Sequence, residues 1–138
     1  MTGALVVDAS ISGAWLLPDE ATDPYAEAAL QATTDHQVWV PALWQIEVGN
    51  LLLSAHRRRR IDDAKRRELV AAAQALRLRV DREPVAMAAL DDLAARHALS
   101  VYDATYLELA LRRNLPLATA DAALLKAMAA AGVARAEL

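Results

Sequence analysis

The stretch from Ala4 to Ser10 constrains the fold more than any other part of the chain. It begins with four apolar residues in a row, two of them β-branched, which is typical of a short strand buried on both faces. The run ends at Asp8, and residues 11–17 then favour a short helix. Because ligands bind at the carboxyl ends of the strands in an open parallel sheet, Asp8 stands where a binding site is expected.

Short apolar strands alternate with helices along the rest of the chain. We expect strands at residues 38–40, 78–80 and 115–119, and a fifth, edge strand is compatible with residues 133–138. The expected helices cover residues 25–33, 42–56, 62–76, 84–95, 103–113 and 121–131. This alternation predicts an α/β fold, with three α/β/α layers and a central parallel sheet of four to five short strands. A length of 138 residues indicates a single domain spanning 1–138.

The composition excludes several classes of protein. Cysteine is absent, which excludes disulfides and thiolate metal sites and accords with a reducing cytoplasm. No apolar run reaches the length of a bilayer span, and the N-terminus lacks the features of a signal peptide, so we expect a cytoplasmic protein without membrane contact. With a net charge of −3, contact with a nucleic acid has to come from a local basic patch. The run Arg57, Arg58, Arg59 and Arg60 is such a patch.

Three aspartates stand at or near the expected starts of helices. Asp8 and Asp121 each follow an apolar strand, and Asp103 opens an expected helix. Aspartate is a preferred N-cap residue, so helix capping alone would explain each of the three. The carboxyl ends of parallel strands, however, lie at one edge of a sheet, which brings Asp8 and Asp121 to the same place. Capping gives no reason for that convergence.

Glu47 lies within an expected helix that is apolar on nearly every side. Glutamate is almost never fully buried unless it is paired. Glu47, Asn50 and Ser54 have helical spacing and form one polar stripe along this helix. A stripe facing water would usually carry lysine and arginine as well, and this one has none before residue 57. We therefore expect the stripe to face the aspartates.

Four carboxylates brought together without basic residues repel one another strongly unless a cation lies among them. Oxygen ligands of this kind suit hard divalent ions, so Mg²⁺ or Mn²⁺ is the expected cofactor. The three histidines, at positions 36, 56 and 97, have no ligand spacing with one another, which argues against zinc. We expect each histidine to lie on the surface.

Four motifs carry these acids, and in this order and spacing they resemble the PIN domain. The motifs are Val-Val-Asp8-Ala-Ser, Glu47-Val-Gly-Asn50-Leu-Leu, Tyr-Asp103-Ala-Thr-Tyr-Leu-Glu-Leu-Ala and Leu-Pro-Leu-Ala-Thr119-Ala-Asp121. The resemblance covers essentially the whole chain. It is closest to the VapC-type toxins of bacterial toxin–antitoxin systems, and the compact length suits a stand-alone toxin.

The resemblance implies a metal-dependent endoribonuclease that forms a homodimer and whose site is blocked by an antitoxin of the VapB type. It implies that Asp8, Glu47, Asp103 and Asp121 are the catalytic residues and hold Mg²⁺ or Mn²⁺, with Asp121 acting directly or through a water. Asn50 is a supporting residue of the site, and Ser10 and Thr119 match hydroxyl positions near it. For Ser10 an N-cap role, and for Thr119 a strand-end role, stay open.

The chemistry agrees with this resemblance. Hydrolysis of a phosphodiester needs an activated water and relief of charge on the phosphoryl oxygens, and a bound metal supplies both. The arginine run could then hold the RNA backbone, since phosphate contacts set affinity and register. Basic residues at a helix C-terminus also complement the helix dipole, so a purely structural role for Arg57–Arg60 stays open.

Two other functions are compatible with acids at the ends of parallel strands. A phosphoryl-receiver-like signalling domain would also place a lysine at a strand end, and the chain has only Lys65 and Lys126, both in expected helices. A non-catalytic interaction module would have no need to keep four acids in register. Both alternatives are weaker than a nuclease.

Overall fold

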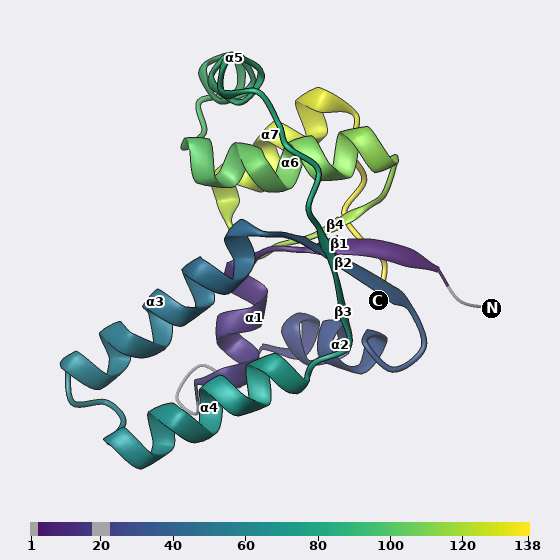
Figure 1. The fold of residues 1–138 in the computed structure, drawn as a ribbon. Helices are drawn as coiled ribbons and strands as arrows, with labels where there is room; N and C mark the ends of the chain where they lie inside the picture. The colour runs from purple at the N-terminus through teal and green to yellow at the C-terminus, as the bar shows by residue number, and fades with distance from the viewer. Residues whose placement is uncertain (1–2, 18–22) are drawn as a thin grey trace.

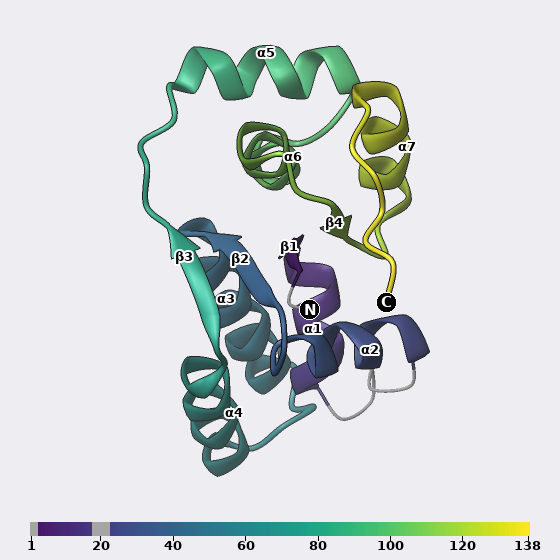
Figure 2. The same cartoon turned by 90° about the vertical axis from the view of Figure 1, so that its right-hand side faces the viewer.

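The computed structural model describes residues 3–17 and 23–138 of the chain. In these residues a sheet of four parallel strands has the order β3-β2-β1-β4 (Figure 2). The strands are β1 (Ala4–Val7), β2 (Gln37–Pro41), β3 (Leu78–Asp81) and β4 (Leu117–Ala118). Because β1 lies between β2 and β4, its carboxyl end is central in the sheet, and the residue that follows it is Asp8.

Helices cover both faces of the sheet, which confirms the three-layer α/β/α prediction (Figures 1 and 2). One face carries α1 (Ala9–Leu16), α2 (Pro24–Ala32), α3 (Leu43–Arg57) and α4 (Asp63–Ala75). The other carries α5 (Met87–His97), α6 (Val101–Arg113) and α7 (Ala122–Ala131), with α6 against β1 and β2 and α5 outside it. A helix that could cross a membrane is absent from residues 3–17 and 23–138.

Two expected elements differ from the structure. The tail at residues 133–138 forms one isolated parallel bridge, between Leu117 and Arg135, and not a fifth strand. Its partner β4 is only two residues long, because Pro116 before it has no N–H to donate. The helix expected from Pro84 begins only at Met87, and Ala86 at its N-cap makes no side-chain hydrogen bond to the first turn.

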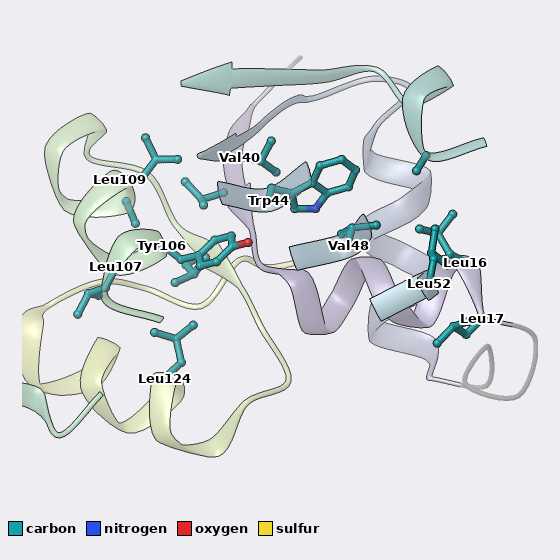
Figure 3. Close-up of a cluster of buried hydrophobic side chains, with 14 of the residues drawn as sticks. Leu16, Leu17, Val40, Trp44, Val48, Leu52, Tyr106, Leu107, Leu109 and Leu124 are labelled. Carbon is teal, nitrogen blue, oxygen red and sulfur yellow. The ribbon is translucent and has the colours of Figure 1, made fainter. Parts of the chain in front are cut away.

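The core consists of Leu, Val and Ala with few aromatic residues. The larger cluster of buried side chains joins α3 to α6 and α7 through the sheet, and Trp44, Val48 and Leu52 line one part of it (Figure 3). Tyr106 is the largest fully buried side chain, and its hydroxyl points away from α6 (Figure 3). Burying a tyrosine in this way requires a hydrogen-bond partner for the hydroxyl.

An ion-pair network around the buried carboxylate of Asp81 fixes α6 on the sheet. The carboxylate of Asp81, at the end of β3, accepts from both terminal nitrogens of Arg112 at 3.0 Å and from Nε of Arg113 at 2.8 Å. The Arg113 guanidinium also lies 3.7 Å from the ring centroid of Trp39 on β2. These contacts hold the C-terminal end of α6, and thereby set where its N-terminal end, which carries Asp103, meets the sheet.

Candidate active site

Asp8 follows β1 and is buried, with 4% of its surface exposed. Its Oδ1 accepts from the hydroxyl of Ser10 at 2.7 Å and from the backbone N–H of Ile11 at 3.2 Å. Its Oδ2 accepts from the hydroxyl of Thr119 at 2.5 Å. Asp8 is therefore the N-cap of α1, as the capping interpretation expected, and Ser10 is not an N-cap but a donor to Asp8.

Hydroxyl groups join the carboxyl ends of β1 and β4. The Thr119 oxygen accepts from the N–H of Asp121 at 3.0 Å, and the Ser10 oxygen accepts from the N–H of Ala120 at 3.4 Å. Asp121 in turn caps α7, since its Oδ2 accepts from the N–H of Leu124 at 2.8 Å. The structure thus brings Asp8 and Asp121 to one edge of the sheet, and both of them also cap helices.

Glu47 faces α6, where Tyr106 was not expected to have a role. The Tyr106 hydroxyl donates to Oε1 of Glu47 at 2.7 Å, and Glu47 is half-buried. The helix that carries Glu47 is also fixed to α1, because Nε1 of Trp44 donates to the Ser12 hydroxyl at 2.8 Å. Two tyrosines, Tyr102 and Tyr106, lie in α6, and nothing in the sequence singles out Tyr106 as the partner of Glu47.

The polar stripe on α3 lines a groove of about 420 Å³. Glu47, Asn50 and Ser54 form one wall, and Ser10 from α1 lies opposite. The stripe therefore opens toward the residues around Asp8, as the sequence predicts.

Asp103 lies in the first turn of α6, where Ser100 is the N-cap. The Ser100 hydroxyl accepts from the N–H of Asp103 at 3.0 Å, so the Asp103 carboxyl does not cap the helix. The capping interpretation is therefore wrong for this residue. Asp103 is half-buried, and its carboxyl group is left for a role other than capping.

The acids act on one another electrostatically. Burial is the main cause that raises the pKa of Asp8, of Glu47 and of Asp103. The charge of Asp103 further raises the pKa of Asp8 and of Glu47, and the charge of Asp121 raises that of Asp103. Hydrogen bonds from Thr119, Ser10, Ile11 and Tyr106 oppose these effects. The four carboxyl groups thus share one region of negative charge, with Asp103 linking the other three.

The acids fit a hard divalent cation by donor chemistry and by charge. Within the described ranges, no three carboxyl or imidazole side chains are gathered so that they could hold an ion as they stand. Mg²⁺ usually keeps several waters and binds through one or two carboxylates, so a set of three direct ligands is not required. Oxygen donors from Asp8, Glu47, Asp103 and Asp121 meet this need.

The histidines supply no alternative metal site. His36 lies against the carboxylate of Asp35, with 2.6 Å between Nδ1 and Oδ1, and Nδ1 of His56 is buried without a partner. We expected all three histidines on the surface, and the structure confirms this only in part, since each side chain is half-buried.

Comparison with known proteins identifies the family. The sequence model of the PIN domain matches residues 5–130. The chain belongs to the PIN-domain family. PIN domains are typically nucleases, and PIN nucleases generally use divalent metals. This membership leaves the phosphoryl-receiver interpretation without support.

Solved structures share the fold of this PIN domain. One is the crystal structure of PAE2754 from Pyrobaculum aerophilum, at 23% identity and a TM-score of 0.69, covering 91% of this chain and 84% of that one. Another is that of FitAcB from Neisseria gonorrhoeae, at 20% identity and a TM-score of 0.60, covering 96% of both chains. No curated protein matches the sequence.

Proposed function

We propose that this PIN domain is a metal-dependent endoribonuclease toxin of the cytoplasm, which hydrolyses RNA phosphodiester bonds and is inhibited by a co-encoded antitoxin. The observation that carries the proposal is the convergence of carboxyl groups at the edge of the sheet, where Thr119 joins Asp8 to Asp121 and where the charge of Asp103 raises the pKa of Asp8 and of Glu47. No lysine or arginine in the described part of the chain forms an ion pair with any of them. Such a site needs a cation from outside the chain.

Asp8, Glu47, Asp103 and Asp121 would hold Mg²⁺ or Mn²⁺, directly or through water. When bound, the ion supplies an activated water and neutralises charge on the phosphoryl oxygens. The chain's own contribution is to hold the acids in place before the ion arrives. Ser10 and Thr119 orient Asp8, and Tyr106 orients Glu47, as hydrogen-bonded neighbours commonly orient metal ligands.

The inhibitor would be a VapB-type antitoxin, a second chain that offers a cation to the same acids. Arginine is the side chain that suits this role, because its planar fork pairs with carboxylates through two hydrogen bonds at once. The proposal rests on the VapC resemblance and on the unpaired acids. A homodimer is part of the same proposal and rests on the resemblance alone.

Incubation of the purified protein with RNA tests the enzymatic part. We expect cleavage with Mg²⁺ or Mn²⁺ and none with chelator, whereas cleavage that chelator does not change would contradict the proposal. Co-expression with the neighbouring reading frame tests the partner. A co-purified complex that fails to cleave RNA is expected, and full activity beside the partner would contradict inhibition.

A further inference from the structure

The groove on α3 extends from Glu47 to the arginines that follow the helix. These arginines lie at the turn between α3 and α4, whose course Figure 1 shows. Its inner end is formed by Glu47 and Ser10, and its outer end by Arg58 and Arg60. At about 1.5 Å of rise per residue, Glu47 and Arg58 are separated by roughly 16 Å along the helix. This is several times the rise of about 3.4 Å per nucleotide in a stacked strand, so the groove is longer than one nucleotide.

The lining of the groove changes in character along its length. Between the two ends lie Asn50 and Ser54, which are neutral hydrogen-bonding side chains. Side chains of this kind and arginines make most protein contacts to phosphate and sugar oxygens. The groove thus begins at Glu47, continues through neutral polar groups and ends at guanidinium groups.

Only part of the arginine run belongs to the groove. Arg58 and Arg60 line it, and Arg57 and Arg59 do not. Arg58 is exposed, and no carboxylate within residues 3–17 or 23–138 forms an ion pair with it. Its backbone N–H, donating to the carbonyl of Ser54 at 3.0 Å, closes the end of α3 without help from the side chain. The guanidinium of Arg58 is therefore available to an anion.

We propose that this groove binds the RNA backbone on one side of the bond to be cleaved. Arg58 binds a phosphate at the outer end, and Asn50 and Ser54 donate to phosphate or ribose oxygens between Arg58 and Glu47. The inference rests on the proposed function for the identity of the strand. It assigns backbone binding to Arg58 and excludes Arg57, its immediate neighbour, from the contact.

Binding of a short fluorescent single-stranded RNA, measured by anisotropy in chelator at several salt concentrations, tests the inference without cleavage. We expect Arg58→Ala to weaken binding and to reduce the slope of log K against log salt by about 0.7, the contribution of one phosphate contact on a single strand. Arg57→Ala, which removes the same charge one residue earlier, should leave the slope unchanged. Asn50→Ala and Ser54→Ala should weaken binding without changing the slope.

The inference is overturned if Arg57→Ala and Arg58→Ala have equal effects, if neither has any, or if the wild-type protein binds no RNA at low salt. Its failure is separable from that of the proposed nuclease. Cleavage with Mn²⁺ that does not distinguish Arg57→Ala from Arg58→Ala contradicts the groove alone. RNA binding that depends on Arg58, in a protein that never cleaves RNA, contradicts the nuclease alone.

Discussion

The hydroxyl of Thr119 donates to Oδ2 of Asp8 at 2.5 Å, across 111 residues of sequence. The same oxygen accepts from the N–H of Asp121, so one fully buried threonine holds the two acids at the ends of β1 and β4. The backbone reinforces this contact, since the N–H of Asp8 donates to the carbonyl of Ala118 at 3.2 Å. Thr119 is therefore a positioning residue for the proposed site, more than the end of a strand.

Thr119→Val keeps the shape of the side chain and removes its hydroxyl. The Asp8 carboxylate loses a donor and the Asp121 N–H loses its acceptor, in a place that water cannot easily reach. We expect the free energy of unfolding to fall by about 1–3 kcal/mol, the usual cost of leaving a buried polar group unsatisfied. Chemical denaturation in chelator at neutral pH measures this, and Thr119→Ser, which keeps the hydroxyl, should lose less. Equal stability of wild type and Thr119→Val would show that the bond is dispensable.

Glu47→Gln should raise the stability of the metal-free protein at neutral pH. Because the pKa of Glu47 is raised by burial and then by the charge of Asp103, its contribution to stability is present at low pH and is lost as pH rises through that pKa. A glutamine carries no charge at any pH. The variant should therefore match wild type near pH 4 and melt at a higher temperature near pH 7.

Mn²⁺ should have the opposite effect on the same pair of proteins. An ion that binds only the folded state stabilises it by about 2.7 kcal/mol when present at a hundred times its Kd. Glu47→Gln loses a ligand, so millimolar Mn²⁺ should raise its melting temperature less than that of wild type. If both proteins shift equally, Glu47 does not take part in binding the ion.

Tyr106→Phe removes the donor to Glu47 and leaves the ring in the core. Since Glu47 is half-buried, water can replace part of the lost bond, and we expect a destabilisation of about 1 kcal/mol. The hydrogen bond also lowers the pKa of Glu47. Without it, the Glu47 carboxyl group should stay protonated to a higher pH in the variant than in wild type. The rate of RNA cleavage, plotted against pH, should therefore begin to rise at a higher pH in Tyr106→Phe than in wild type. An unchanged profile would mean that Tyr106 serves packing only.

Asp81→Asn tests the network that fixes α6. Hydrogen bonds from Arg112 above all, and then from Arg113, lower the pKa of Asp81 to about 2. Its contribution to stability is therefore present above the unfolded value of 3.8 and is lost as pH falls toward 2. The arginines left behind are partly exposed, so removing the Asp81 carboxylate should cost about 2 kcal/mol at neutral pH, the value of a pKa shift of this size. Chemical denaturation should show a smaller difference in the free energy of unfolding between wild type and Asp81→Asn at pH 2 than at pH 7. The same difference at both pH values would contradict the role given to the Asp81 carboxylate.

The sequence predicts the parts of this fold that depend on local pattern. Apolar runs identify the strands, and helix-start residues identify most of the helices, so the ends of β1 and β4 and their acids follow from the chain alone. The polar stripe containing Glu47 is also visible in the sequence, because an acid in an apolar helix is costly to bury.

The residues that hold the acids in place are harder to find from the sequence. Tyr106 reads as an ordinary core residue, and only its distance from Glu47 in space reveals the hydrogen bond. Arg135 lies in the tail at residues 133–138, which is compatible with an edge strand from its sequence, and its guanidinium donates to the carbonyl of Thr119 at 3.0 Å. Such contacts join segments far apart in the chain, and neither periodicity nor capping rules carry information about them.

The most direct test of the central claim is the rate of RNA cleavage, with saturating Mn²⁺, by wild type, Asp8→Asn and Asp103→Asn. Each change removes one negative oxygen and little volume, and circular dichroism serves to check that the fold is kept. Because even outer neighbours of a metal site are commonly worth 10–100-fold, we expect each variant to lose at least about a hundredfold in rate. Cleavage by either folded variant at close to the wild-type rate would contradict the assignment of these acids to the active site.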